Sequence, residues 1–500
     1  MTTLTSKAIL IAFGSGAAQV LTVLTGVVLA RLLSRTDFGT YKQVFLVYQI
    51  FTPIFTVGIP AGLFYFLPRI RDLELKKQFI SRSISLLIFT AILLTVFIFV
   101  SAFWAPRVMH NPKLMIPLMI FSVYAFATVV EQFFQPLLIM YNKLNLLLIY
   151  PIVRSTLFFI PTVTLAFLFG GNLQIIFLAL SLVSLIFPFF GIIYTKRMVA
   201  LEKILSFDLS NYKEQLAYGI PLGVTSIIGL IAWEFDKLVV SINFPPELYA
   251  VYVVGATEIP FVSLIRSSVN QVVLPEMAKA YSEGNTKRLV EVWHNSIRKI
   301  SLIILPVFVI AMIFSHEIIT LLYSEKFASS VPYFRIYLLL LLIRVASYGI
   351  VLQAIGKTRE NLKGSIVFFV INAILNPVLV FTLGLAGPAV ATVISTFINV
   401  FYYVIVIKRY VKISLADVFP WTVVLKILSI SILSALPISL ILYLNLEVLV
   451  KMFLAGTVYS LVYLLLIIKL NALSHLDRQL LSGYVNKILA NSLNKFRSRP

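Results

Sequence analysis

The chain contains no cysteine and only four histidines in 500 residues. Without cysteine there are no disulfides, thiolate zinc sites, iron–sulfur ligands or cysteine nucleophiles. No histidine has a second histidine three or four residues away; they are His110, His294, His316 and His475. We therefore expect no metal centre, no cofactor and no catalytic residue.

Charged residues are also scarce. They make up 12% of the chain, and hydrophobic residues make up 60%. A soluble domain has about 25% charged and about 45–50% apolar residues. The polar surface would not cover so much apolar material in water, so the solvent for most of this chain is lipid. Because every backbone polar group must be paired inside a bilayer, the composition predicts an all-α integral membrane protein.

Long polar segments are missing as well. No loop between apolar runs exceeds about 25 residues, and no glycine-rich phosphate-binding loop is present. There is no room for a soluble catalytic domain, so we predict that the protein is not an enzyme and does not use ATP. The first apolar stretch, residues 8–33, is too long for a signal-peptide core of about 7–15 residues and is expected to be a retained span.

Apolar runs between polar breaks predict about fourteen spans, since a span needs about 20 apolar residues. The expected spans are 8–30, 43–66, 83–103, 114–138, 147–168, 173–194, 220–243, 249–274, 300–315, 333–355, 365–383, 386–407, 421–444 and 448–468.

Lysine and arginine placement sets the orientation. With a cytoplasmic N-terminus, the inside segments hold 28 of the 41 lysines and arginines and the outside segments hold 7. This predicts a multi-pass plasma-membrane protein with both termini in the cytoplasm. The net charge of +21 is then a topology signal that also attracts anionic lipids, and nucleic-acid binding is not expected.

Short matches recur about 205–211 residues apart, such as Ala12-Phe13-Gly14 with Ala217-Tyr218-Gly219. Six spans per copy predict two lobes related by a pseudo-twofold axis along the membrane normal, with a substrate site between them. The predicted units are an N-terminal six-helix lobe (1–205), a C-terminal six-helix lobe (206–410), two additional helices (411–470) and an amphipathic cytoplasmic tail (471–500). A second interfacial amphipathic helix is expected over 276–299.

Three segments resemble the polysaccharide exporters and oligosaccharide flippases of the multidrug/oligosaccharidyl-lipid/polysaccharide (MOP) superfamily. Residues 30–41 (ARLLSRTDFGTY) are similar to the first outside loop of that family. Residues 318–327 (IITLLYSEKF), followed by Val331-Pro332, are similar to the fifth outside loop. Residues 384–395 (GLAGPAVATVIS) look like the turn into span twelve.

The resemblance implies a substrate and a mechanism. The substrate would be a polyprenyl-pyrophosphate-linked oligosaccharide, a precursor of O-antigen, capsule or exopolysaccharide, flipped from the inner to the outer leaflet. The two lobes would rock between inward-open and outward-open states. Glycan polymerases or glycosyltransferases would be partners.

Ionisable residues inside spans mark candidate site positions, because burying one costs about 2.5–3.5 kcal/mol on insertion scales. Arginine suits a pyrophosphate because its planar fork donates two hydrogen bonds at once. The basic candidates for a cationic substrate cavity are Arg266, Arg344, Arg154 and Lys237. An interhelical ion pair is the alternative for each of them.

Four acidic residues also lie in predicted spans: Glu131, Glu234, Asp236 and Glu258. They are either salt-bridge partners of the cations or groups that couple transport to a proton or Na⁺ gradient. Two further functions stay open. One is a cation-coupled multidrug antiporter of the same superfamily, against which the intramembrane cations argue. The other is a membrane-embedded glycan polymerase or ligase, for which the outside loops are too short.

Overall fold

A computed structural model describes residues 4–56, 58–206 and 212–472, and every regular element within them is helical. The predicted all-α membrane fold is confirmed. Ten helical segments in these ranges are long and apolar enough to cross a membrane. One of them, Thr358–Val411, is 54 residues long and contains two helices, each long enough for a crossing of about 30 Å. The count of fourteen stays a prediction.

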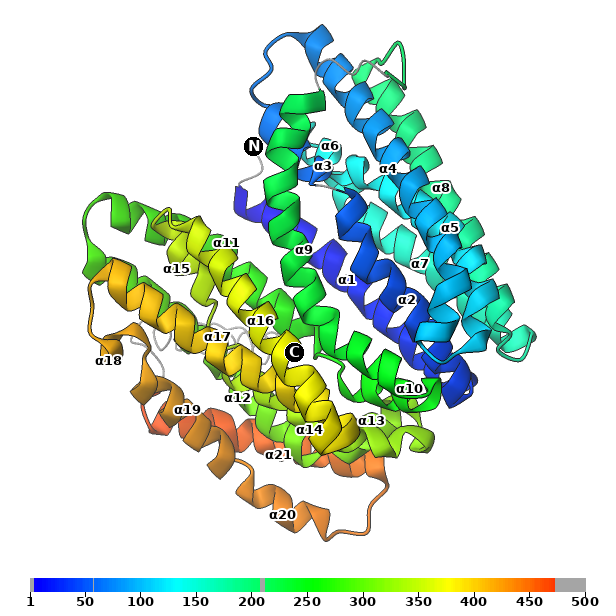
Figure 1. Cartoon of the computed structure of the whole chain (residues 1–500). Coiled ribbons are helices and arrows are strands. Elements are labelled where there is room, and N and C mark those ends of the chain that lie inside the picture. Colours follow the sequence, from blue (N-terminus) through cyan, green and yellow to red (C-terminus); the bar gives the residue numbers. More distant parts are fainter. Residues whose placement is uncertain (1–3, 57, 207–211, 473–500) are drawn as a thin grey trace, which may run out of the picture.

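The first half of the molecule contains eight α-helices, which lie together in Figure 1, coloured blue to cyan. They are α1 (Leu4–Leu32), α2 (Arg35–Thr56), α3 (Ile59–Phe66), α4 (Leu73–Val108), α5 (Met115–Val130), α6 (Phe134–Met140), α7 (Leu144–Leu168) and α8 (Leu173–Val199), with short 3₁₀ turns η1 (Pro112–Leu114) and η2 (Glu131–Phe133).

The second half begins with α9, which lies between the two groups of helices in Figure 1. It comprises α9 (Tyr212–Asn243), α10 (Pro246–Gly255), α11 (Pro260–Ser282), α12 (Thr286–Ile313), α13 (Ser315–Tyr323), η4 (Glu325–Ser330), α14 (Val331–Leu338), η5 (Leu339–Leu342), α15 (Tyr348–Ala354), α16 (Thr358–Leu383), η6 (Gly384–Ala386) and α17 (Gly387–Val411).

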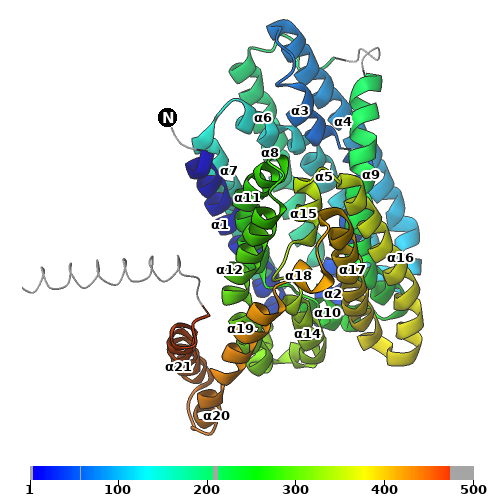
Figure 2. The same ribbon diagram turned by 90° about the vertical axis from the view of Figure 1, so that its left-hand side faces the viewer.

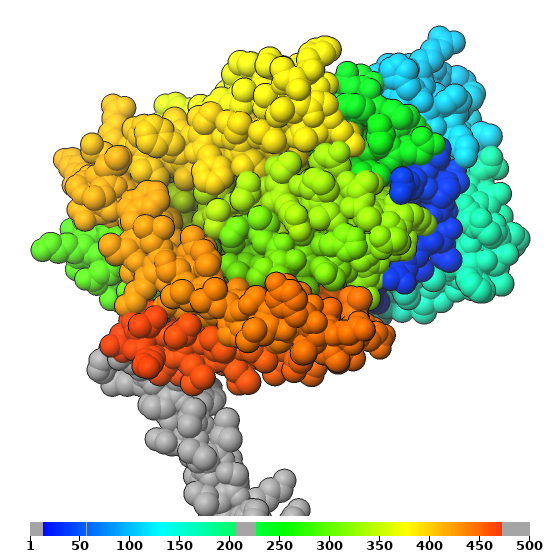
Figure 3. Space-filling view, turned by 90° about the horizontal axis from the view of Figure 1, so that it is seen from below, coloured from blue at the N-terminus to red at the C-terminus, as the bar shows by residue number. Residues whose placement is uncertain are grey.

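Four more helices follow: α18 (Leu415–Val418), α19 (Trp421–Leu433), α20 (Leu436–Leu442) and α21 (Val448–Lys469). Figure 2 shows α19 to α21 at one side of the second half, and Figure 3 shows them, orange to red, as a band along one edge. Tyrosines hold α21 in place: the Tyr463 hydroxyl donates to the carbonyl of Leu302 on α12 at 2.9 Å. These helices therefore pack on the outside of α12.

Polar caps set several helix starts. The Asp72 carboxylate accepts from the Leu75 backbone N–H at 2.8 Å and begins α4. Asn172 begins α8 and Asn285 begins α12 in the same way. These side chains satisfy backbone donors that the first helical turn leaves free. Each cap lies between an apolar run and its neighbour, so the long helices begin where the polar breaks of the sequence fall.

Three predicted spans are interrupted, which apolar content alone did not reveal. The span predicted at 43–66 contains α2 and α3, with Gly58 in the left-handed conformation between them. The span predicted at 249–274 unwinds between α10 and α11, and the one predicted at 333–355 unwinds between η5 and α15. Irregular backbone at membrane depth is tolerated where it is buried or lines a cavity.

The interfacial helix predicted over 276–299 is wrong. The structure continues α11 to Ser282 and begins α12 at Thr286, so this polar stretch forms the ends of two long helices and the turn joining them. The predicted span 300–315 is correspondingly the later part of α12. The predicted tail lies outside the described residues from 473 onward.

The two halves meet at one end of the molecule, at the start of α2 and the region of α10, α13 and η4 (Figure 1). Arg31 donates from Nε to the carbonyl of Leu322 at 2.9 Å and also contacts the carbonyl of Leu321. In return Lys326 donates to the carbonyls of Arg31 and Leu33 at 2.9 and 2.6 Å. This junction is called the closed end; it also includes the contacts of Thr36 and Gly39 with the start of α10, described next.

Gly39 on α2 allows the closest backbone approach at the closed end. A Cβ atom at this position would lie 1.9 Å from the carbonyl oxygen of Pro246, at the start of α10. Beside it, the Thr36 hydroxyl donates to the Glu247 carboxylate at 2.6 Å. Only glycine permits this contact between the halves, because any side chain would overlap the backbone of Pro246.

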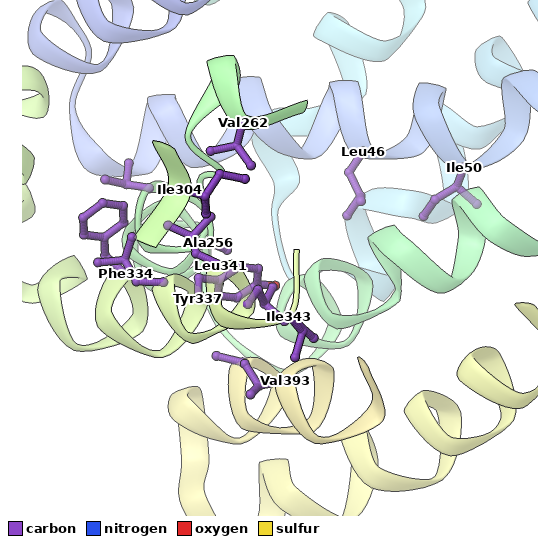
Figure 4. Close-up of a cluster of buried hydrophobic side chains, with 14 of the residues drawn as sticks. Leu46, Ile50, Ala256, Val262, Ile304, Phe334, Tyr337, Leu341, Ile343 and Val393 are labelled. Carbon is purple, nitrogen blue, oxygen red and sulfur yellow. The ribbon is translucent and has the colours of Figure 1, made fainter. Parts of the chain in front are cut away.

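A continuous apolar core joins the halves. Figure 4 shows Leu46 and Ile50 on α2 and, apart from them, a group of second-half residues that includes Tyr337 and Ile343; all four belong to one buried hydrophobic cluster. Leu46 and Ile343 are both buried. The core therefore fixes α2 against the second half, where α2 packs on α10 and α9.

Candidate functional site

The main candidate site is a cavity of about 680 Å³ in the second half, called the cationic pocket here. Trp233 of α9, Arg266 and Asn270 of α11, and Asn399 of α17 contribute to its wall. The two unwound segments of the second half also line it, through Glu258 and through residues 343–347. Interrupted helices and unwound backbone are the usual place for a substrate site in transporters with internal repeats.

Glu258 and Arg344 join the two unwound segments across this pocket. The Arg344 guanidinium donates to both carboxylate oxygens of Glu258, with Nη2 2.8 Å from Oε1. The guanidinium also lies 4.7 Å from the centre of the Trp233 ring. The Arg344 side chain is 11% exposed and that of Glu258 is 31% exposed, so the pair is shielded but can be reached from the pocket.

Arg266 is different, because it has no ion pair or hydrogen bond to the described residues. Its Nε atom is buried without a partner. Its surroundings include the like charge of Arg344 and the opposite charge of Glu258. A fixed cation left free within a membrane protein favours an anionic ligand, since the cost of burying it is otherwise not offset.

The charges of the cationic pocket do not cancel. Its lining includes two arginines and one carboxylate, which gives a formal net charge of +1. Amides add polar groups: Asn270 donates to Ser347 at 2.9 Å, and Gln271 and Gln353 lie on the same wall. The arrangement suits a bidentate contact with a phosphate or pyrophosphate.

A second cavity, of about 630 Å³, lies in the first half and is called the neutral pocket here. Glu131 of η2 and Arg154 of α7 form an ion pair there, with Arg154 Nε 2.8 Å from Oε1 and 3.1 Å from Oε2. The Tyr150 hydroxyl also donates to Glu131 at 2.6 Å. The Arg154 guanidinium lies over the ring of Phe158. Arg154 is therefore neutralised by a direct partner.

Lys237 has a partner too. Its ammonium donates to the Glu234 carboxylate at 2.8 Å, one turn earlier on α9. Lys42 of α2 interacts electrostatically with both Glu234 and Lys237. It has no ion pair among the described residues. Lys42 lies within α2, with its ammonium over the Phe38 ring.

Asp236 is fully buried on α9. Its Oδ2 atom accepts from the Tyr252 hydroxyl at 2.6 Å and from the Tyr337 hydroxyl. Its Oδ1 atom is buried and has no partner among the described residues. A buried carboxylate oxygen without a donor is costly, so this atom has room for one further polar contact.

An apolar groove of about 690 Å³ adjoins the cationic pocket. It runs between α11, α12, α13 and α21, and its walls include Leu302, Ile310 and Tyr463. Glu258 lines both cavities. The structure therefore places an apolar channel next to a cationic pocket.

Sequence reasoning that followed charge alone missed the uncharged polar residues. Gln132 and Gln135 in the neutral pocket, and Gln271 in the cationic pocket, were not among the predicted positions. A signal was available, because each is an amide that interrupts or borders an apolar run. Amides in a span need partners or a water-filled cavity for the same reason as charges.

Comparison with known proteins agrees with this architecture. The profile of a family described as polysaccharide biosynthesis protein matches residues 28–332, more than half of the chain. The profile of lipid II flippase MurJ matches residues 248–464. A curated relative, the probable low-salt glycan biosynthesis flippase Agl15 of Haloferax volcanii, is 24% identical over 197 residues. That match covers 38% of this chain and 41% of the relative.

Solved structures show the same fold. The lipid II flippase MurJ in an inward closed conformation has a TM-score of 0.72 at 16% identity, covering 92% of this chain and 99% of that chain. An inward-facing multidrug resistance MATE family transporter has a TM-score of 0.64 at 17% identity, covering 80% and 95%. The chain thus belongs to the polysaccharide biosynthesis protein family within the MOP flippase superfamily, and it is a multi-pass membrane protein.

Proposed function

We propose that this chain flips a polyprenyl-pyrophosphate-linked oligosaccharide, a precursor of O-antigen, capsule or exopolysaccharide, across the membrane. The observation that carries the proposal is the shared wall at Glu258. It places a pocket with net positive charge directly beside an apolar groove. A pyrophosphate would bind Arg266 and Arg344 while its polyprenyl chain lies in the groove. The names of the two flippase relatives support the same substrate class.

The orientation follows from the charge distribution. The plasma membrane is the expected location, with both termini in the cytoplasm and the lysine-rich and arginine-rich loops inside. The closed end then faces outward, and the two pockets are filled from the cytoplasmic side. Transport would proceed by rocking of residues 1–205 against 206–410, with the closed-end contacts broken in the outward-open state.

The multidrug antiporter is the second candidate, because MATE transporters share the fold. A pocket for cationic drugs needs net negative charge, whereas the lining of the cationic pocket sums to +1. The electrostatics therefore favour an anionic substrate.

A strain deleted for this gene, and lacking any redundant flippase, tests the function. We expect polyprenyl-linked oligosaccharide to accumulate on the cytoplasmic leaflet, because synthesis continues and translocation stops. The wild-type gene should relieve the accumulation. The leaflet distribution is measured by whether an impermeant glycan-modifying reagent reaches the lipid in intact cells. Normal surface glycan without accumulation would contradict the proposal and favour efflux of another solute.

Asp236 is our candidate for coupling transport to a proton or Na⁺ gradient. Its unpartnered oxygen can gain a proton or cation, while two tyrosine hydroxyls hold the other oxygen. In vesicles, an imposed gradient of one of these ions should accelerate flipping by the wild type but not by Asp236→Asn. Glu202→Gln, an exposed carboxyl outside these cavities, is the control. A wild type indifferent to both gradients would exclude this role.

A further inference from the structure

The proposed binding of the pyrophosphate and the polyprenyl chain does not use the neutral pocket. Its charged residues are Glu131 and Arg154, which form a direct ion pair, so its formal net charge is zero. An anion gains little electrostatic binding free energy there, in comparison with the cationic pocket, whose lining carries a net charge of +1. Its wall mixes these charged groups and amides with apolar side chains such as Leu138 and Leu147, whereas the apolar groove is almost wholly apolar.

Two amides in this pocket lack partners. Gln132 is half-buried and Gln135 is exposed, and neither has a hydrogen bond to the described residues. An amide offers both donors and an acceptor, which is also what a sugar hydroxyl offers. At membrane depth such groups face water or a ligand, since an unsatisfied amide in hydrocarbon is costly.

Aromatic groups complete the wall. Phe64 of α3 lines the pocket and is 43% exposed, and Tyr48 and Tyr150 lie on the same wall. Aromatic rings next to hydrogen-bonding groups give a surface that is partly apolar and partly polar. A hexose ring has the same mixture, with C–H groups on its faces and hydroxyls around its edge. The volume of about 630 Å³ lies within the range of small-molecule sites, about 300–1,000 Å³.

The neutral pocket lies beside the other half of the molecule. Pro60 and Phe64 of its wall belong to α3, which packs against α9 of the second half. Trp233 of the cationic pocket also lies on α9. Both pockets therefore border α9, the neutral pocket through α3 and the cationic pocket through Trp233.

We propose that the neutral pocket is a binding site for the sugar part of the substrate, with Gln132 and Gln135 as its hydrogen-bonding residues. This inference rests on the proposed function, since it assigns a different part of the same lipid-linked glycan to each pocket. The second half holds the anionic headgroup, and the first half holds uncharged sugar hydroxyls. Glu131, Arg154 and Tyr150 form a hydrogen-bonded group in the same lining.

A pair of lipid probes tests the assignment. One is lipid-linked oligosaccharide extracted from cells deleted for this gene, and the other is polyprenyl pyrophosphate without sugar. Binding of both to the purified full chain in lipid nanodiscs is measured for the wild type and for Gln132→Leu/Gln135→Leu. The double variant should bind the glycan-bearing lipid about tenfold more weakly, a loss typical of two neutral hydrogen bonds. Its affinity for the bare lipid should not change.

Two controls separate the outcomes. Gln174→Leu, an exposed glutamine at the start of α8, should bind both lipids like the wild type. Arg266→Ala should weaken the binding of both lipids to a similar extent. If the glutamine double variant weakened the binding of both lipids equally, or of neither, the assignment of the sugar site would be refuted. A wild type that binds both lipids with one affinity would also overturn it. A wild type that binds neither would instead refute the proposed function itself.

Discussion

Replacing Arg266 with alanine should abolish export while leaving the protein at least as stable as the wild type. Arg266 has no partner among the described residues and lies near the like charge of Arg344. Its removal therefore breaks no hydrogen bond or ion pair to the described residues, and it relieves the cost of a buried cation. The substrate would lose charge-assisted hydrogen bonds worth about 1.5–3 kcal/mol, about 10- to 150-fold in affinity.

Arg344→Ala should abolish export too, but with a loss of stability. Its removal leaves the Glu258 carboxylate without its bidentate partner, in a pair that is largely shielded from water. Breaking a buried pair in this way costs about 3–5 kcal/mol. Both variants should therefore lose export in transport assays. Thermal unfolding in detergent should show a lower unfolding temperature for Arg344→Ala than for Arg266→Ala.

Arg107→Ala is the matched control, because Arg107 is exposed near the end of α4 and lines neither pocket. It should export like the wild type. Wild-type export by both Arg266→Ala and Arg344→Ala would refute the cationic pocket as the site of transport. A large stability loss in Arg266→Ala would mean that this arginine is structural.

Gly39→Ala should lower the population of the conformation described here, in which the closed end is formed. The added methyl group would lie 1.9 Å from the carbonyl oxygen of Pro246, so α2 and α10 must separate. Overpacking of this kind costs about 1–3 kcal/mol. Because each 1.4 kcal/mol is about a factor of ten, the closed end would open in a population about 5- to 150-fold larger. Export should fall because the cycle returns to this state less often.

Cysteine cross-linking can measure that opening, since the chain has no cysteine of its own. Thr36 and Glu247 are hydrogen-bonded across the closed end, so Thr36→Cys/Glu247→Cys should cross-link readily in an otherwise wild-type chain. Gly39→Ala should reduce the yield. Gly229→Ala is the matched control, because a Cβ at Gly229 meets nothing within 4 Å. Equal yields in the two alanine variants would show that Gly39 has no part in closure.

Much of the fold was accessible from the sequence because it depends on local composition. Long apolar runs specify membrane helices whatever their partners, and caps such as Asp72 lie where polar breaks occur. Interruptions were harder to predict. The unwound segment at Glu258 lies inside a run that remains apolar on average, and hydropathy averaged over about 20 residues does not detect four unwound ones.

Candidate site residues could be named from the sequence, but their geometry could not. Glu234 and Lys237 lie three residues apart on one helix, so their pairing was visible in the sequence. Glu258 and Arg344 are 86 residues apart, and only the folded chain brings their unwound segments together. For the same reason, the sequence did not distinguish Arg266, which has no partner among the described residues, from the paired cations. The paired cations are Arg154, Lys237 and Arg344. Charge is a property of a residue, whereas neutralisation depends on long-range packing.

The closed end also bears on how such a protein can diverge. Arg31 and Lys326 donate to backbone carbonyls, not to carboxylates. Any amino acid at positions 321 and 322 supplies the same acceptors, provided that the chain follows the same path. Substitutions on that side need no compensating change on the other, so paired substitutions between homologues would give no sign of this contact. The junction can persist between relatives whose sequences there have drifted apart.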